Sequence, residues 1–261
     1  MGKIIVISNL KGGCGKSFTA ANLGVGLARQ GKRVLLLDAD SQHSLTVSLG
    51  IADPDKLPTT LASIMSSIIN DTNYDPITGI IHHVEGVDLI PANFALAGTE
   101  LALVSTLSRE TILRQYIEKV KNLYDWLIID TSPSLGLLTV NALVAADTAL
   151  IPVIPKYLDV KGLELLLKTI SQIRKQINPK LTIAGILLTM VEKRTNFTKE
   201  IISLIEDAYG DNIHIFGDYI PRSTRAAETS AIGKSIFFHD PKGKVAAAYA
   251  ALTKEVLSNV A

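Results

Sequence analysis

Short apolar runs alternate along the chain with longer segments in which apolar residues recur every three to four positions. The short runs are rich in Val, Ile and Leu, which is typical of strands buried on both faces of a sheet. They predict strands over residues 3–8, 33–38, 87–90, 126–130, 148–153 and 182–189. The longer periodic segments predict helices over residues 17–29, 109–122, 137–146, 162–177, 197–209 and 242–260.

The order of these elements predicts the fold class. Strands and helices alternate, which is the pattern of βαβ units and indicates an α/β protein with a three-layer, doubly wound and mostly parallel sheet. Residues 50–86 interrupt the pattern with three Pro and several Asn and Asp, so we expect a loop-rich excursion with one short helix there. The length of 261 residues suits one sizeable domain, and we expect residues 1–261 to form it.

Composition excludes several classes of protein. The longest apolar region, residues 135–155, is broken by polar residues and two Pro, so no transmembrane helix is predicted. The N-terminus runs directly into a strand without the pattern of a signal peptide, which predicts a cytoplasmic location. The single cysteine, Cys14, excludes an intrachain disulfide framework and a CxxC metal pair. A net charge of +1 gives no global attraction to nucleic acid or membrane.

The clearest chemical signal follows the first predicted strand. Residues 11–17 read KGGCGKS and pass directly into a predicted helix. Glycines let successive backbone N–H groups turn toward phosphate oxygens, and the N-terminal end of the helix adds a favourable dipole. We therefore expect a phosphate loop in which Lys16 neutralises the β- and γ-phosphates and the Ser17 hydroxyl binds Mg²⁺. An incidental glycine-rich turn is the alternative, and the flanking strand and helix argue against it.

Lys11 is a second cation in a loop that is already cationic. Such a charge is costly unless a strongly anionic group lies near it, so its position indicates contact with a triphosphate. A solvated surface lysine is the alternative interpretation.

Two apolar strands end in aspartates. Residues 34–40 read VLLLDAD and residues 126–130 read WLIID. In an open α/β sheet the ligand binds at the carboxyl ends of the strands, so Asp38, Asp40 and Asp130 should converge on the phosphate loop. Asp130 matches a Walker B aspartate and is predicted to hold Mg²⁺ directly or through water. Capping of the helix that follows is the alternative role.

The loop motif resembles the KGGxGK[ST] pattern of the ParA/MinD family of deviant Walker A ATPases, and the resemblance covers nearly the whole chain. It implies ATP and Mg²⁺ as cofactors and a homodimer with ATP sandwiched at its interface, in which Lys11 acts in trans. Hydrolysis would be slow and stimulated by a partner. The nucleotide-binding residues that it implies are Lys11, Gly12, Gly13, Cys14, Gly15, Lys16, Ser17 and Phe18. Lys11, Lys16 and Asp40 would be catalytic, and Ser17, Asp38 and Asp130 would bind the metal.

The resemblance also assigns two switch segments. Residues 38–42, DADSQ, match the first switch, in which Asp40 would orient the attacking water and Asp38 would order Mg²⁺ and its waters. Residues 130–136, DTSPSLG, resemble the second switch. This chain reads His43-Ser44 where the family more often has Gly-Asn, and it has Cys14 and Phe18 where Val and Thr are common. We interpret the last two as packing variants.

Two segments of the C-terminal third also resemble ParA proteins. Residues 185–190, GILLTM, and 220–222, IPR, resemble the walls of the adenine pocket, which implies that Met190 and Pro221 lie beside the base; ordinary packing is the alternative. Arg194, Arg222 and Arg225 are candidates for nonspecific DNA binding. Phosphate contacts of this kind would be strongly salt-dependent without reading the sequence. A solvated basic surface is the alternative.

These features predict an ATPase that partitions or positions a cargo. Dimers would bind nucleoid DNA in the cytoplasm, and a ParB-like or McdB-like adaptor on a plasmid, chromosome or carboxysome would trigger hydrolysis and release. A MinD-type membrane ATPase is the main alternative, but it needs a basic amphipathic C-terminal helix, and residues 246–257 are alanine-rich. A synthetase or an iron protein on the same scaffold is the third. The iron protein needs interface cysteines that the chain lacks.

Overall fold

The computed structural model of the chain describes residues 2–192 and 196–260, without the side chains of residues 157–161, 196 and 197. The described strands form one seven-stranded sheet in the order β3-β4-β2-β5-β1-β6-β7. The β3–β4 pair is antiparallel and the other pairs are parallel. The strands are β1 (Lys3–Ile7), β2 (Val34–Ala39), β3 (Ile81–His82), β4 (Asp88–Ile90), β5 (Trp126–Thr131), β6 (Thr148–Val153) and β7 (Thr182–Leu188).

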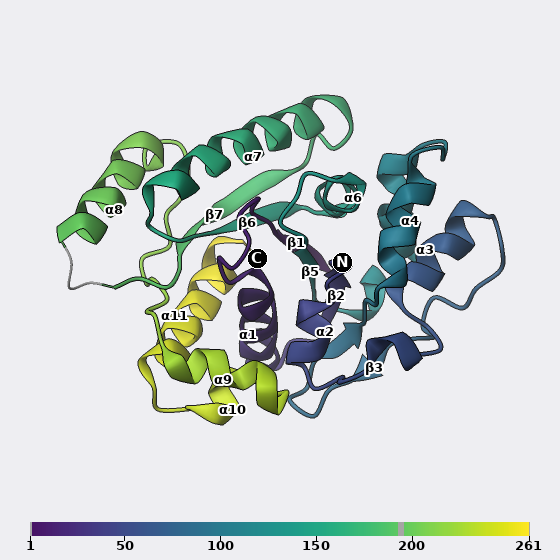
Figure 1. Cartoon of the computed structure of the whole chain (residues 1–261), viewed down its shortest axis with the longest axis horizontal. Coiled ribbons are helices and arrows are strands. Elements are labelled where there is room, and N and C mark those ends of the chain that lie inside the picture. Colours follow the sequence, from purple (N-terminus) through teal and green to yellow (C-terminus); the bar gives the residue numbers. More distant parts are fainter. Residues whose placement is uncertain (1, 193–195, 261) are drawn as a thin grey trace.

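Helices cover both faces of this sheet (Figure 1). One layer contains α1 (Lys16–Ala28), α2 (Ser44–Ser48), α9 (Thr224–Ile232), α10 (Ile236–His239) and α11 (Lys244–Asn259). The other contains α3 (Leu61–Ile69), α4 (Ala95–Leu103), α5 (Ile112–Val120), α6 (Leu137–Ala145), α7 (Tyr157–Gln176) and α8 (Asn196–Tyr209). The predicted three-layer, mostly parallel α/β fold is confirmed.

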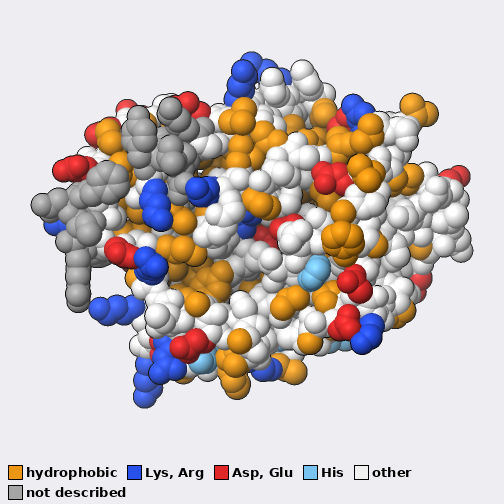
Figure 2. All heavy atoms as spheres, in the orientation of Figure 1, with side chains coloured by type: hydrophobic (Ala, Val, Ile, Leu, Met, Phe, Trp, Pro, Cys, Tyr) orange, Lys and Arg blue, Asp and Glu red, His pale blue; other side chains and the backbone are white. Residues whose placement is uncertain are grey.

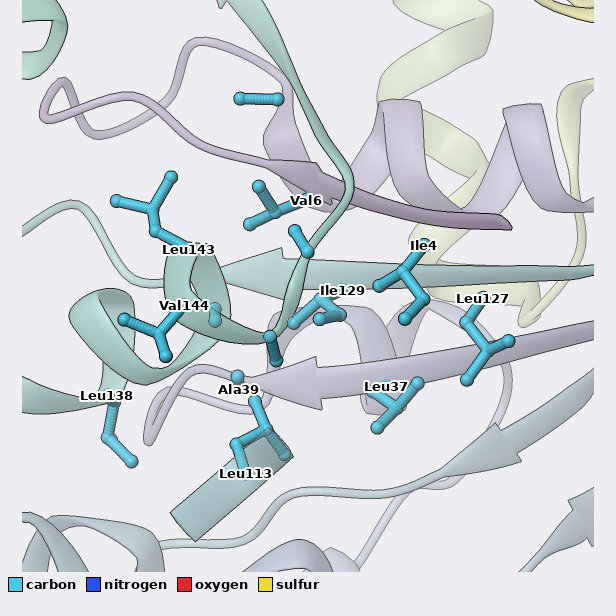
Figure 3. Close-up of a cluster of buried hydrophobic side chains, with 14 of the residues drawn as sticks. Ile4, Val6, Leu37, Ala39, Leu113, Leu127, Ile129, Leu138, Leu143 and Val144 are labelled. Atoms are coloured by element: carbon cyan, nitrogen blue, oxygen red, sulfur yellow. The ribbon is translucent and has the colours of Figure 1, made fainter. Parts of the chain in front are cut away.

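The apolar strands contribute side chains to one hydrophobic core on each face of the sheet. In β1, Ile4 and Val6 pack toward α6, whereas Ile5 and Ile7 pack toward α1. Figure 3 shows the first of these cores, where side chains of β1, β2 and β5 gather with Leu138, Leu143 and Val144 of α6. Because both faces are buried, the strands read as continuous apolar runs rather than as alternating ones.

The structure differs from the predicted elements in a few places. The predicted helix over residues 109–122 is α5 flanked by two 3₁₀ turns, and α7 begins at residue 157 rather than 162. The prediction missed β3, α4, α9 and the short helices α2 and α10. The excursion over residues 50–86 contains α3, as expected. In the described part of the chain, no helix is both long and apolar enough to cross a membrane.

Candidate nucleotide site

The phosphate loop forms the turn between β1 and α1. Gly13 and Gly15 have φ angles of 71° and 85°, which L side chains rarely adopt. A Cβ on Gly13 would meet no atom within 4 Å, so glycine is needed there for its backbone conformation rather than for space. Gly15 immediately precedes α1, which brings the positive end of that helix to the loop.

Neighbouring side chains hold the backbone of the loop. Asn9 accepts a hydrogen bond from the Lys11 N–H at 3.0 Å, and the Thr189 hydroxyl donates to the Cys14 carbonyl at 2.8 Å. The buried Cys14 thiol donates to the Lys11 carbonyl at 3.2 Å, and burial raises the pKa of this thiol. Cys14 therefore contributes to the loop through its backbone, while its side chain is buried beneath the loop.

The two lysines of the loop lie in different surroundings. Lys16 is buried, and its ammonium group donates to the Lys11 carbonyl at 3.0 Å, which holds it across the loop. Lys11 is exposed at the tip, together with Gly12 and Gly13. A buried lysine beside the loop can neutralise an anion there, whereas an exposed lysine can reach beyond its own protomer.

A cavity of about 390 Å³ opens at this loop. Its volume lies within the range of small-ligand sites. It is lined by the loop and by segments that follow β2, β5 and β7, namely Gly12, Gly13, Gly15, Lys16, Ser17, Phe18, Asp40, Gln42, Ser44, Pro133 and Met190. The fold thus gathers most of the predicted nucleotide-binding residues around one space.

Asp38 and Asp130 are paired residues of the neighbouring parallel strands β2 and β5. Both are completely buried, and they share one site of low dielectric. Burial raises the pKa of Asp38 to about 6. It raises the pKa of Asp130 well above the usual range, and the charge of Asp38 adds to this effect.

The two carboxylates differ in their hydrogen bonds. Asp38 accepts from the Thr46 N–H at 2.8 Å, from the Thr46 hydroxyl at 2.7 Å and from the Asp40 N–H at 3.2 Å. Neither oxygen of Asp130 has a hydrogen-bond partner among the described residues. An unpaired carboxylate in a buried site is costly, so a cation is expected there.

The surroundings of Asp130 fit Mg²⁺. The hydroxyl of Ser17 lies close enough to lower the pKa of Asp130, as does the charge of Lys16, although neither reverses the effect of burial. Carboxylate and hydroxyl oxygens are the donors that Mg²⁺ prefers. Asp38 is already held by hydrogen bonds within the protein. We therefore expect it to contact the water ligands of Mg²⁺ rather than the ion itself.

The first switch segment borders the cavity through Asp40. This side chain is buried, and its Oδ1 accepts from the Gln42 N–H at 2.9 Å. His43 follows with a φ angle of 46°, in the left-handed region that glycine favours. A glycine would adopt this conformation without the strain that a side chain brings.

The second switch segment is held by hydroxyl groups. The Thr131 hydroxyl donates to the Ile7 carbonyl at 2.9 Å, and the hydroxyls of Ser132 and Ser134 lie 3.0 Å apart. Pro133 lines the cavity beside Gly12, where a Cβ added to that glycine would lie 3.9 Å from the proline Cβ. The segment thus lies beside the phosphate loop at the cavity.

The two predicted neighbours of the adenine line different cavities. Met190 borders the cavity at the loop and has a φ angle of 52°. Pro221 borders a second cavity of about 860 Å³. A bridge between Val191 and Pro221 joins the two segments. The second cavity is lined by Val191, Glu192, Gly217, Asp218, Tyr219, Pro221, Arg222, Lys244, Ala247, Ala248 and Ala251.

The predicted DNA-binding arginines are only partly described. Arg194 lies outside the described residues. Arg222 is exposed and pairs with Glu192 at 2.5 Å, and Arg225 is exposed and pairs with Glu228 at 3.4 Å. Each of these two arginines therefore carries its charge beside a carboxylate.

Sequence reasoning missed two residues that organise the site. Thr46 holds Asp38, and Thr189 holds the carbonyl of Cys14. A hydroxyl residue six positions after an Asp-Ala-Asp motif, and one at the end of a strand, were the available signals. Each is too common in proteins to stand out.

Comparisons with known proteins show the family to which the chain belongs. The AAA domain family matches residues 2–183. The sporulation initiation inhibitor protein Soj of Bacillus subtilis is 43% identical over 99% of this chain and 100% of its own length. The chromosome partitioning protein ParA of Caulobacter vibrioides is 35% identical over 98% of this chain and 94% of its own length.

Solved structures agree as well. The crystal structure of cobyrinic acid a,c-diamide synthase from Mycobacterium smegmatis with a bound ATP analogue and magnesium has a TM-score of 0.79 and 33% identity, over 94% of this chain and 98% of that one. That structure contains a nucleotide analogue and a metal on a fold similar to the one described above. By its full-length similarity to Soj and ParA, this chain belongs to the ParA/Soj family of AAA-domain P-loop ATPases.

Proposed function

We propose that residues 1–261 act as one partitioning or positioning ATPase domain that binds ATP and Mg²⁺ and dimerises around the nucleotide. The observation that carries this proposal is the unpaired Asp130 carboxylate beside a phosphate loop with one buried and one exposed lysine. The 43% identity to Soj over the whole chain favours a partition function over the diamide synthesis named for the 33% identical structure.

The buried side of the site would bind the triphosphate. The loop N–H groups and Lys16 hold the β- and γ-phosphates, and Lys16 exchanges the Lys11 carbonyl for phosphate oxygens. Ser17 and Asp130 hold the metal, and Asp38, kept in place by Thr46, orders its waters. When bound, Mg²⁺ neutralises charge on the phosphate oxygens.

Asp40 would orient the water that attacks the γ-phosphate. It lies in the wall of the cavity and is held by the Gln42 N–H. Positioning by one carboxylate gives slow hydrolysis, which suits a timer that a partner accelerates.

Lys11 would complete the site of the partner protomer. Because Lys11 is exposed at the tip of the loop, it can reach a nucleotide held by a second copy. ATP then joins two protomers, and hydrolysis releases them.

The dimer would bind nonspecific DNA on the nucleoid through Arg194, Arg222 and Arg225. Two protomers double the number of phosphate contacts, so binding should need ATP and weaken with salt. A ParB-like or McdB-like adaptor on the cargo would stimulate hydrolysis. A MinD-type membrane role is less favoured, because α11 buries Tyr249, Leu252 and Val256 against α1 instead of presenting them to lipid.

Binding to random-sequence duplex DNA tests the proposal. We expect tight DNA binding with ATP and Mg²⁺ but not with ADP or without nucleotide. The affinity for DNA should fall steeply from the lower to the higher of two salt concentrations. The Asp40→Ala variant should bind DNA with ATP and fail to release it, because it cannot hydrolyse the nucleotide. Binding that is independent of the nucleotide, or normal hydrolysis by Asp40→Ala, would contradict it.

A further inference from the structure

Helix α4 and the residues on either side of it carry exposed apolar side chains, which we call the α4 stripe: Phe94, Leu101, Val104 and Leu107. Leu101 is 74% exposed and Leu107 is 92% exposed. The opposite side of α4 is buried through Leu96 and Leu103. Monomeric proteins rarely leave large apolar side chains gathered in water, so the α4 stripe marks an interaction surface.

The α4 stripe lies on the same face of the molecule as the phosphate loop. Figure 2 shows hydrophobic side chains gathered over α4 and α6, beside the hollow at the centre of this face. The second switch segment spans the distance between them, since Pro133 lies next to Gly12 and α6 begins directly after this segment. The stripe is therefore continuous with the edge of the nucleotide site.

Glu100 joins α4 to the second switch. Gly136, the N-cap of α6, has no side chain that could cap the helix, and Glu100 Oε1 accepts from the Leu138 N–H at 3.3 Å. A Cβ on Gly136 would lie 2.1 Å from that oxygen, so glycine leaves the space that Glu100 occupies. A carboxylate at this position also stabilises the positive end of α6.

The charged groups Arg109, Glu110 and Asp55 beside the α4 stripe are held by contacts within the chain. Arg109 pairs with Glu110 at 3.1 Å and donates to the Val104 carbonyl at 2.8 Å. Asp55 accepts from the Phe94 N–H at 3.1 Å. Because these groups already have partners within one protomer, the exposed apolar side chains are what the stripe offers to a second copy, and a two-fold interface brings like residues together.

The size of a stable interface also favours a second copy as the occupant. The loop tip exposes only a lysine and two glycines, which supply little apolar area. A stable interface buries about 800 Å² on each partner around an apolar centre. Surface next to the loop must supply that centre, and the α4 stripe lies there.

We propose that the α4 stripe packs against a second copy of this chain in the ATP-bound dimer, and that Glu100 positions the second switch behind it. This inference rests on the proposed ATP-dependent dimer. It adds a surface outside the nucleotide site to that dimer, and it makes α4 the element that connects the interface to the switch.

The test compares Leu101→Ser/Val104→Ser with wild type. Sedimentation with ATPγS and Mg²⁺ measures the dimer, and a fluorescent ADP measures nucleotide binding by the monomer. We expect the dimer dissociation constant to rise at least tenfold while the affinity for ADP changes less than twofold. The control is Val84→Ser/Phe238→Ser, which alters other exposed apolar residues and should dimerise normally.

A second readout does not depend on a weakened variant. Leu107→Cys labelled with a polarity-sensitive dye should report an apolar environment with ATPγS and a wet one with ADP, and Cys14 is too buried to compete for the dye. Unchanged dimerisation of the double variant, or an unchanged dye signal, would overturn the inference, even if another partner then proved to use the stripe. A wild-type chain that stays monomeric with ATPγS would instead overturn the proposed dimer itself.

Discussion

The carboxylate of Asp38 accepts two hydrogen bonds from Thr46, at 2.8 Å from its N–H and at 2.7 Å from its hydroxyl. The same hydroxyl oxygen accepts from the Ala92 N–H at 3.0 Å. Thr46→Val removes the hydroxyl and leaves two buried polar groups each short of a partner. We expect the free energy of unfolding to fall by about 1–3 kcal/mol, measured by urea denaturation.

Thr46→Ser is the matched control. It keeps the hydroxyl and removes one methyl group, so its stability should fall less than that of Thr46→Val. An equal fall in the two variants would mean that packing, and not the hydrogen bonds to Asp38 and Ala92, determines the effect.

Asp130→Asn should stabilise the protein in the absence of nucleotide and metal. The wild-type carboxylate is buried without a hydrogen-bond partner among the described residues, and Asp38 lies beside it on the next strand. A neutral amide has a smaller desolvation cost and removes the repulsion between the two carboxylates. We expect a higher melting temperature in EDTA, together with a loss of Mg²⁺-dependent ATP hydrolysis.

The matched comparison is Asp38→Asn, which replaces an acceptor of three hydrogen bonds. This variant should become less stable rather than more stable. If both variants shift the melting temperature in the same direction, the unpaired state of Asp130 is not the cause.

The fold could be predicted because each strand of its centre is buried on both faces. Continuous apolar runs such as residues 34–37 and 126–129 are typical of strands that are buried on both faces. Their alternation with helical segments predicts a sheet between two layers of helices. The missed elements have weaker patterns. β3 has only two residues, and α4 has apolar residues on both its buried and its exposed sides, so no helical period is visible in its sequence.

The parts of the candidate site that lie within one short segment could be predicted from the sequence. The phosphate loop and Asp40 line one cavity, and Asp38 and Asp130 are paired on neighbouring strands, because parallel strands bring their carboxyl ends to the same edge. Contacts between distant segments could not be predicted. Thr189 lies 175 residues from the Cys14 carbonyl that it holds, and Glu100 lies 38 residues from Leu138.

Lys11→Ala should abolish ATP-dependent dimerisation and spare nucleotide binding by the monomer. Lys11 is exposed at the loop tip, whereas the buried Lys16 remains to hold the phosphates. Sedimentation with ATPγS and Mg²⁺ measures the dimer. The exposed Lys254 on α11 provides the control, Lys254→Ala, which removes the same charge away from the loop. A dimer of wild-type mass in Lys11→Ala would refute the role in trans.

The ion pair of Arg33 and Asp125 should give a pH-dependent contribution to stability. The Arg33 guanidinium lowers the pKa of Asp125 to about 2, below its unfolded value near 3.8. The pair therefore stabilises the fold above about pH 4, and this contribution disappears as the pH falls toward 2. The difference in urea stability between wild type and Asp125→Asn should be larger at pH 6 than at pH 3. A difference that stays constant with pH would contradict this.

Arg225 and Glu228 give a pair of variants with opposite expected effects on DNA binding. The two side chains form an exposed ion pair at 3.4 Å, so Glu228 competes with phosphate for the guanidinium. Arg225→Ala should weaken ATP-dependent binding to random duplex DNA and reduce the salt slope by about 0.9 for each phosphate that the arginine had neutralised. Glu228→Gln should strengthen binding, because it releases Arg225 and removes a repulsive charge. If both variants bind like wild type at low salt, this surface does not contact DNA, and the basic residues that do so lie elsewhere on the dimer.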